Sequence, residues 1–275
     1  MAALHVVRRH AARAAWLRDT AAVGREWDAT TYDRIADPMT RWGSAVLDRL
    51  PLRGDEHVLD AGCGTGRVTE QLLGRLPDGQ VVALDGSSAM IDEARQRLVG
   101  WSDRVTFVVA DLLEPLPIDE PVDAILSTAT FHWVTDHDRL FRNLASVLRP
   151  GGLLVAQCGG GPNIESVLVA AGKVMADFGL DPAWRGPWLF ATPEETSRRL
   201  AAAGFTDIET WLNPEPTPLE AGGPLETYLV TVILREHLAR IPEDRRAEFA
   251  HAVAAGLPRP EIDYVRLNIV CRRAA

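Results

Sequence analysis

The sequence has little lysine and little cysteine. Lys173 is the single lysine among 29 basic residues, which we interpret as a compositional bias toward arginine and not as a site. The three cysteines, Cys63, Cys158 and Cys271, are far apart and lack the spacing of metal ligands. This pattern indicates reduced thiols in a cytoplasmic protein and predicts no metal site. No apolar run is long enough to span a bilayer, so we expect a soluble protein without a membrane partner.

Positive charge is also scarce relative to negative charge, and the formal net charge is −9. A protein that binds nucleic acid needs a basic face for the phosphates, so nucleic acid is excluded as the main partner. The 275 residues, 47% of them hydrophobic, suffice for one domain with a substantial core. We expect this domain over residues 25–275. The preceding Ala- and Arg-rich segment, 1–24, is predicted to be a packing helix, a targeting peptide or an arm for homo-oligomerisation.

Strands and helices alternate from residue 57 to residue 158, which predicts an α/β fold with a doubly wound, mostly parallel sheet. Seven strands are expected, near 57–61, 80–85, 104–110, 122–126, 153–158, 208–212 and 264–271. The main helices are expected at 67–76, 88–98, 136–148 and 192–203, with Ser88 and Thr192 as caps of the second and the fourth. Two further segments, about 159–190 and 213–260, interrupt the alternation. They are predicted to form a helical lid, with helices to residue 178 and over 224–240 and 242–255.

Residues 58–66 (VLDAGCGTG) carry the strongest local signal in the chain. They form a short apolar run that ends in an acid, followed by three glycines at alternate positions and then by a helical pattern. A strand, a tight glycine turn and a helix in this order predict a place where the main chain approaches a ligand closely.

Three ligands compete for this turn. A dinucleotide needs G-x-G-x-x-G, but Arg67 stands where the third glycine would fall. A phosphate loop needs a Gly-Lys-Ser/Thr ending, and the turn has no lysine. S-adenosylmethionine has no phosphates. It needs close backbone approach at its amino-acid end, together with acids for its amino group and its ribose.

The acids that S-adenosylmethionine needs stand at the ends of three successive strands. Asp60, Asp85 and Asp111 close the first, second and third predicted strands. Because parallel strands end at one edge of a sheet, we expect the three carboxylates to share that edge. Asp85 can accept hydrogen bonds from the ribose hydroxyls, and Asp111 from the adenine amine. The pattern therefore favours S-adenosylmethionine.

The same stretches resemble the motifs of class I S-adenosylmethionine-dependent methyltransferases. The resemblance covers roughly residues 55–158, and its motifs are 58–66 (VLDAGCGTG), 83–90 (ALDGSSAM), 110–112 (ADL) and 148–154 (LRPGGLL). It implies the Rossmann-like methyltransferase fold and S-adenosylmethionine as cofactor. More narrowly, 129–137 (ATFHWVTDH), the helical insertion and the ending 267–273 (LNIVCRR) are similar to the trans-aconitate methyltransferase group.

The resemblance implies a set of cofactor-binding residues at four strand ends and in the N-terminal arm. These are Asp60, Ala61, Gly62 and Gly64 at the methionine part, Asp85, Gly86 and Met90 at the adenosine, Asp111 and Leu112 at the adenine, Thr128, Ala129 and Trp133 near the methyl group, and Trp27 over the cofactor. The same comparison implies catalytic roles for His132 and for Tyr32, an aromatic of the arm.

The acceptor is less well defined by the sequence. Methyl transfer is an in-line displacement, so a base is needed only where the nucleophile is not already ionised. His132 is either that base or a hydrogen-bonding wall residue, and the trans-aconitate group tends to carry glutamine at this position. A tricarboxylate would need a basic clamp, but Arg185 stands among aromatic residues that favour an apolar acceptor or form lid core.

The sequence therefore predicts an S-adenosylmethionine-dependent methyltransferase of a small molecule. The reaction is either O-methylation of a carboxylate or hydroxyl, or C-methylation of an apolar or aromatic, natural-product-like acceptor. The alternative from another class is a non-catalytic protein that binds S-adenosylmethionine as a sensor or scaffold. An oxidoreductase would require glycine at position 67 and a phosphate partner, and the chain lacks both.

Overall fold

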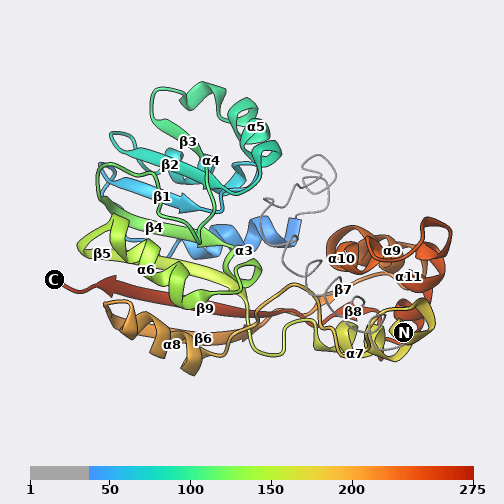
Figure 1. The fold of residues 1–275 in the computed structure, drawn as a ribbon. Helices are drawn as coiled ribbons and strands as arrows, with labels where there is room; N and C mark the ends of the chain where they lie inside the picture. Colours follow the sequence, from blue (N-terminus) through green and yellow to red (C-terminus); the bar gives the residue numbers. More distant parts are fainter. Residues whose placement is uncertain (1–36) are drawn as a thin grey trace, which may run out of the picture.

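A seven-stranded sheet forms the centre of the molecule in the computed structural model, which describes residues 37–275 (Figure 1). The strand order is β3-β2-β1-β4-β5-β9-β6, and β9 alone runs opposite to the other six strands. The strands are β1 (His57–Ala61), β2 (Gln80–Asp85), β3 (Val105–Val109), β4 (Val122–Thr128), β5 (Leu148–Gly159), β6 (Phe205–Pro214) and β9 (Val265–Arg273). All seven predicted strands are present, so the mostly parallel, Rossmann-like sheet is confirmed.

Helices cover both faces of the sheet, which explains why its central strands are apolar without interruption. Neighbouring residues of one strand enter opposite cores: Val58 packs with one cluster and Leu59 with the other. The first cluster lies beneath α3 (Asp37–Leu47), α4 (Arg67–Gly74) and α5 (Ser88–Arg97), and the second beneath α6 (His137–Val147) and α8 (Pro193–Ala202).

The helix caps match the prediction at one helix and differ by one residue at another. Thr192 Oγ1 accepts a hydrogen bond from the Glu195 N–H, and the Glu195 side chain accepts one from the Thr192 N–H, so α8 begins with a complete capping box. The predicted cap of α5 is wrong: Ser87, and not Ser88, accepts from the Met90 N–H. Ser87 has the extended backbone that a cap requires, whereas Ser88 is already helical.

The two segments predicted as a lid come together in one body, which we call the helical lobe (residues 163–190 and 217–262). Its elements are α7 (Glu165–Val174), η3 (Met175–Phe178), α9 (Gly223–Tyr228), η4 (Leu229–Ile233), α10 (Arg235–Leu238), η5 (Glu243–Arg245), α11 (Arg246–Ala255) and the short pair β7 (Thr217–Pro218) and β8 (Glu261–Ile262). The lobe lies on the side toward which the parallel strands point (Figure 1).

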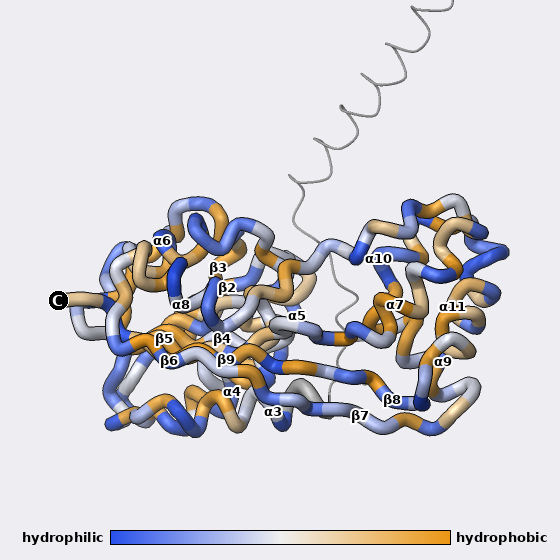
Figure 2. Tube along the Cα trace, turned by 90° about the horizontal axis from the view of Figure 1, so that it is seen from below, coloured by the Kyte–Doolittle hydropathy of each residue, from blue (hydrophilic) through white to orange (hydrophobic). Residues whose placement is uncertain are grey.

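The helical lobe has a hydrophobic core of its own. Figure 2 shows apolar segments gathered among α7, α9, α10 and α11, separate from those of the sheet. The helix predicted over 224–240 is interrupted, because the chain passes from α9 through a π-helical turn at Leu229–Ile233 into α10. Within the described residues no helix is long and apolar enough to cross a membrane.

One histidine of the lobe core has no polar partner among the described residues. His237 is 0% exposed, and both ring nitrogens lack a hydrogen bond within the described part of the chain. Trp184 lies against the ring at 4.7 Å between centroids. Burial, together with the positive charge of Arg240, lowers the pKa of His237 to about 4. The folded protein therefore holds this imidazole neutral.

We predict that the protein loses stability in mild acid through His237. The unfolded chain binds a proton near pH 6.5, whereas the folded chain does so only near pH 4, so stability falls as the pH drops through this window. The contribution is about 1–2 kcal/mol at pH ~5 relative to pH ~8. Urea unfolding of His237→Phe at both pH values should show a smaller loss than the wild type.

The exposed His251, which pairs with Glu226, provides the control for this experiment. The variant His251→Gln should keep the wild-type pH dependence. An unchanged dependence in His237→Phe would contradict the prediction.

Candidate active site

The glycine turn between β1 and α4 is fastened to the end of β2. The N–H groups of Gly62 and Cys63 both donate to the Leu84 carbonyl, at 2.7 and 2.9 Å. Gly62, Gly64 and Gly66 have φ values of +84°, +54° and +81°, a region that residues with a side chain rarely adopt. The left-handed backbone explains the alternating glycines.

Gly62 and Gly64 differ in the space that a side chain would find at each position. A Cβ on Gly62 would stand 2.1 Å from Thr130 Oγ1, so packing against the end of β4 excludes any larger residue. A Cβ on Gly64 would meet no heavy atom of the described chain within 4 Å. The backbone at Gly64 therefore borders open space, as a turn that holds a ligand closely must.

Asp60 has a buried carboxylate oxygen that is not used inside the described chain. The side chain is 1% exposed, Oδ2 accepts from Thr69 Oγ1 at 2.7 Å, and Oδ1 has no hydrogen-bond partner. Burial and, to a smaller extent, the charge of Asp85 raise the pKa of Asp60 to about 7 against the opposing Thr69 bond. A ligand ammonium group beside Asp60 would satisfy this oxygen and lower that pKa.

Asp85 connects two turns. Its Oδ2 accepts from the Gly64 N–H and its Oδ1 from the Ser87 N–H, both at 2.9 Å. Gly86 is exposed beside it, and Met90 is buried below. A carboxylate oxygen has capacity for more than one donor, so Asp85 remains able to accept from ribose hydroxyls.

The remaining predicted cofactor residues lie at the same edge of the sheet. Asp111 is exposed and its Oδ1 accepts from the Leu113 N–H at 2.9 Å, while Leu112 is buried. The parallel register aligns Ala61 with Leu84, and Leu84 with Val108. The fold thus gathers the three acids that the sequence identified at one edge of the sheet, and their acceptor oxygens fit the donor groups of S-adenosylmethionine.

The end of β4 makes a sharp turn toward the glycine turn. Ala129, which follows Thr128, has φ +55°, a strained conformation for alanine, and its N–H donates to the Gln157 carbonyl at 2.7 Å. The Thr130 hydroxyl donates to the Gly62 carbonyl at 3.2 Å. This turn starts η2 (Phe131–Trp133) and brings His132 and Trp133 to the same edge.

The ring of His132 is held by the main chain. The Gly159 N–H donates to Nδ1 at 3.3 Å, and the ring is only 8% exposed. Because a backbone N–H is always a donor, Nδ1 must be the unprotonated nitrogen and the proton of the neutral ring lies on Nε2. The Leu189 N–H also donates to the His132 carbonyl, at 2.9 Å. In this state Nε2 presents a hydrogen-bond donor, not a base.

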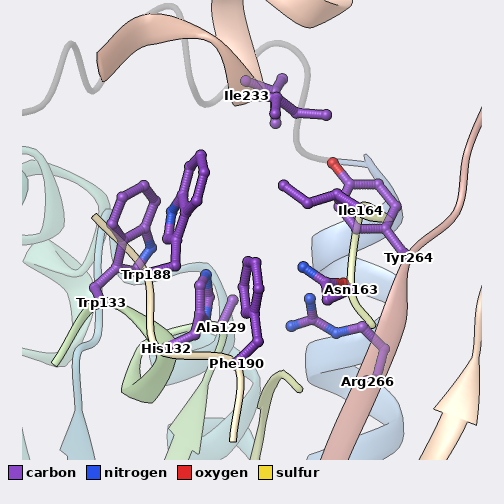
Figure 3. A pocket seen from close by; sticks show the side chains of 11 residues that line it. Ala129, His132, Trp133, Asn163, Ile164, Trp188, Phe190, Ile233, Tyr264 and Arg266 are labelled. Atoms are coloured by element: carbon purple, nitrogen blue, oxygen red, sulfur yellow. The ribbon is translucent and has the colours of Figure 1, made fainter. Parts of the chain in front are cut away.

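A pocket opens between these residues and the helical lobe (Figure 3). Its lining combines the end of β4, the helical lobe with its aromatic loop (residues 184–190), and the start of β9. The lining residues are Ala129, His132, Trp133, Asn163, Ile164, Trp188, Phe190, Val232, Ile233, Tyr264 and Arg266. One wall is aromatic, with Trp188 stacked on Phe190 at 5.7 Å and 12°, and Phe190 stacked on His132 at 6.0 Å and 27°.

Arg266 supplies a positive charge on the other wall, which sequence reasoning missed. It is 3% exposed, and its guanidinium lies 4.7 Å from the centre of the Trp42 ring. Asn163 lies beside it, with Oδ1 accepting from the Val265 N–H at 2.9 Å. A signal existed in the sequence, since Arg266 is a charged residue near the start of a strand that is otherwise largely apolar.

The aromatic residues around Arg185 were expected either to face the acceptor or to form lid core, and the loop contains residues of both kinds. Arg185 is exposed and pairs with Glu165 at the surface, so it is not a clamp in this pocket. Trp184 packs on His237 in the lobe core, whereas Trp188 and Phe190 line the pocket. The predicted arm residues Trp27 and Tyr32 lie outside the described residues.

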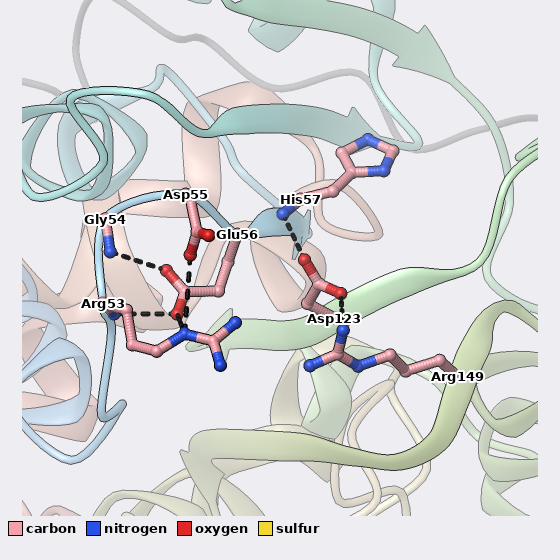
Figure 4. Close-up of polar contacts among 7 residues, drawn as sticks. All are labelled: Arg53, Gly54, Asp55, Glu56, His57, Asp123 and Arg149. Carbon is pink, nitrogen blue, oxygen red and sulfur yellow. Dashed lines mark hydrogen bonds and ion pairs between the residues drawn. The ribbon is translucent and has the colours of Figure 1, made fainter.

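A second cluster of charges lies at the opposite end of β1 and β4 (Figure 4). Glu56 accepts from the N–H groups of Arg53 and Gly54, and Asp123 accepts from the His57 N–H and pairs with Arg149. These acids already bind main chain or arginine, which is a structural role. No group of residues among 37–275 has the composition of a metal site.

Known proteins match this chain in sequence. A family model described as a methyltransferase domain matches residues 58–152. The chain is 31% identical over 260 residues to a trans-aconitate 2-methyltransferase of Methylobacterium nodulans, covering 90% of this chain and 98% of the relative. A trans-aconitate 2-methyltransferase of Acidovorax ebreus is 36% identical over 183 residues, covering 66% of this chain and 67% of the relative.

A solved structure agrees with the fold. Phosphoethanolamine N-methyltransferase 2 of Haemonchus contortus, determined with S-adenosylhomocysteine, superposes with a TM-score of 0.60 at 19% identity, covering 90% of this chain and 57% of that one. These matches lend no support to a non-catalytic sensor or scaffold. The Methylobacterium relative is matched over nearly its whole length, so the chain belongs to the class I S-adenosylmethionine-dependent methyltransferases, with S-adenosylmethionine as cofactor, and resembles the trans-aconitate methyltransferase group.

Proposed function

We propose that this methyltransferase esterifies the carboxylate of a small organic acid. The observation that carries the proposal is Arg266, a buried cation on the wall of the pocket that also contains His132. A carboxylate is the group that a buried guanidinium binds best. An acceptor ammonium group would be repelled by Arg266. The trans-aconitate methyltransferases to which the chain is similar are, by name, enzymes of an organic acid.

We assign the cofactor to the edge formed by β1, β2, β3 and β4. Asp60 would accept from the ammonium of the methionine part through its unused Oδ1, and Gly62 and Gly64 would border that part. Asp85, Gly86 and Met90 would hold the ribose side, and Asp111 and Leu112 the adenine. Bound there, S-adenosylmethionine supplies an electrophilic methyl group on a sulfonium. Thr128, Ala129 and Trp133 would border the transfer site.

His132 would act as a donor toward the acceptor. A carboxylate is ionised at neutral pH and needs no base, which agrees with the proton of His132 lying on Nε2. One carboxylate oxygen forms the new bond to the methyl carbon while the carbon–sulfur bond breaks and its electron pair stays on sulfur. The products are a methyl ester and a neutral thioether, and no proton is transferred.

The helical lobe would serve as the lid of this reaction. It contributes Trp188, Phe190 and Ile233 to the pocket, so its position over the strand ends would exclude water from the transfer site. We keep for the arm the roles expected from its sequence: Trp27 and Tyr32 over the cofactor, and residues 1–24 as a helix that packs on the domain or joins two copies.

The direct test of the function is a product assay. Purified protein with S-adenosylmethionine and a panel of organic acids that includes trans-aconitate should release S-adenosylhomocysteine and form a methyl ester detectable by mass spectrometry. A panel of phenols, amines and carbon acids run beside it should give no methylated product. Methylation of these compounds in place of the acids would overturn the proposal.

We predict that Asp85→Ala weakens binding of S-adenosylhomocysteine by at least about 100-fold, because the change removes both a ribose acceptor and the link between two turns. Calorimetric titration measures this loss. Asp92→Ala, at an exposed acid of α5 that pairs with Arg95, should bind as the wild type does. Micromolar affinity retained in Asp85→Ala would sink the assignment.

We predict that His132→Gln keeps kcat within about tenfold of the wild type, because the amide NH₂ can donate to the acceptor as Nε2–H does. A general base contributes about 10²–10⁴-fold, so its loss would be far larger. Steady-state kinetics between pH ~6 and ~9 distinguish the two roles. If His132→Gln lowers kcat by a thousandfold or more, and by more than His132→Asn does, the result would indicate that His132 is the general base.

A further inference from the structure

We propose that Thr130 is a positioning residue that sets the distance between the methyl donor and the acceptor. It lies between the glycine turn, at the edge to which we assign the cofactor, and the turn after β4 that leads to His132. Its hydroxyl and its methyl group hold these two turns at one separation. The inference rests on that assignment of the cofactor and does not require the acceptor to be an acid.

Side chains of β4 continue its contact with β1 beyond the last main-chain pair. The register of the two strands ends at Leu126. Beyond it, Ser127 Oγ donates to the Ala61 carbonyl at 2.7 Å, and Thr130 Oγ1 donates to the Gly62 carbonyl at 3.2 Å. The two hydroxyls bind successive carbonyls of the chain that leaves β1, so the second hydrogen bond joins the β4 turn to the glycine turn.

The hydroxyl of Thr130 binds both turns at once. Its oxygen lies 3.0 Å from the Thr128 carbonyl and 3.2 Å from the Gly62 carbonyl. Because a hydroxyl carries one hydrogen, the two carbonyls share it in a three-centre bond. Thr128 and Thr130 flank Ala129, whose strained φ of +55° persists only where the surrounding contacts hold it. The hydroxyl therefore ties the strained turn to the glycine turn.

The side chain of Thr130 also packs directly on Gly62. A Cβ on Gly62 would stand 2.1 Å from Oγ1, 2.3 Å from Cγ2 and 2.6 Å from Cβ of Thr130. These distances are shorter than any van der Waals contact, so the threonine occupies the space that a side chain at Gly62 would need. The two turns are in close contact, and a shift of one of them displaces the other.

Each turn also has an anchor of its own. Main-chain N–H groups of the glycine turn donate to the Leu84 carbonyl in β2, and the Ala129 N–H donates to the Gln157 carbonyl in β5. These anchors do not involve the hydroxyl of Thr130. We therefore expect that loss of this hydroxyl leaves both turns folded and changes their separation.

The main chain of Thr130 connects this separation with the transfer site. The Trp133 N–H donates to the Thr130 carbonyl at 2.9 Å, so Thr130 starts η2, which carries His132. Methyl transfer is an in-line displacement, and a misplacement of about 1 Å can cost about 100-fold in rate. A change at Thr130 should therefore appear in the rate of transfer and not in the affinity for either substrate.

The first experiment needs no acceptor. Amide hydrogen exchange of a peptide that spans residues 127–135 is followed by mass spectrometry, with and without saturating S-adenosylhomocysteine. We expect the ligand to slow exchange by about fivefold or more in the wild type and by less than about twofold in Thr130→Val, because valine keeps the shape but cannot donate. Equal slowing in the two proteins would overturn the link between the turns. If Asp85→Ala binds S-adenosylhomocysteine as the wild type does, the assignment of the cofactor fails and the inference fails with it.

A second threonine provides a matched control. Thr210 is half-buried between β6 and α8, away from both turns, and its hydroxyl donates to the Pro193 carbonyl at 3.0 Å. Thr210→Val removes the same kind of hydrogen bond, so urea unfolding should show a loss of stability similar to that of Thr130→Val. Its exchange and its kcat should be those of the wild type. Effects on kcat as large as those of Thr130→Val would show a general structural role and overturn the proposal.

The second experiment measures the rate of methyl transfer in a single turnover, with the acid of the product assay that yields the most methyl ester. Thr130→Val should slow transfer by about 10- to 100-fold, while KM for the acid and the affinity for S-adenosylhomocysteine stay within about threefold. Thr130→Ser keeps the hydroxyl and should restore most of the rate.

Two outcomes of the second experiment would overturn the positioning role of Thr130. One is a loss in Thr130→Ser as large as in Thr130→Val, and the other is a parallel loss of affinity for S-adenosylhomocysteine in Thr130→Val. If no acid is methylated by the wild type, the proposed function fails, and the exchange experiment decides the inference by itself.

Discussion

The carboxylate of Asp85 is the interaction that holds together the edge of the sheet to which we assign the cofactor. It accepts from Gly64 in one turn and from Ser87 in the next, so two loops that follow different strands have one fixed geometry. The three left-handed glycines leave the first turn without side chains that could fill the space, and Asp85 fixes the main chain of this turn at the Gly64 N–H. A single acid thereby fixes two turns at the edge to which we assign the cofactor.

The pocket to which we assign the acceptor is built differently from the edge with the three acids, because its residues come from distant stretches of the chain. His132 follows β4, Phe190 ends the aromatic loop, Asn163 precedes α7 and Arg266 lies near the start of β9. Main-chain hydrogen bonds hold these parts in place: Gly159 and Leu189 at His132, and Val265 at Asn163. The pocket exists only when the lobe and the sheet are assembled, so its specificity is a property of the whole fold.

This contrast explains what could be predicted from the sequence. The sheet and the edge with Asp60, Asp85 and Asp111 follow from local patterns, since each acid ends an apolar run and parallel strands share an edge. The features that the sequence did not predict depend on tertiary packing. The helix predicted at 224–240 breaks at a π-helical turn inside the lobe core, and the cap of α5 moved to Ser87. The position of Arg266 across the pocket from His132 became visible only when β9 was placed beside β5, because no local pattern connects the two residues.

The reversed direction of β9 has a consequence for how such an enzyme changes over evolution. Every other strand that reaches this edge does so with its last residues, but β9 arrives with its first ones, Val265 and Arg266. Val265 and Arg266 do not belong to the turns after β1, β2 and β3 to which we assign the cofactor. Mutations at the start of the final strand therefore offer a route to new acceptors that leaves the methyl donor's site untouched, and specificity can drift while the chemistry is conserved.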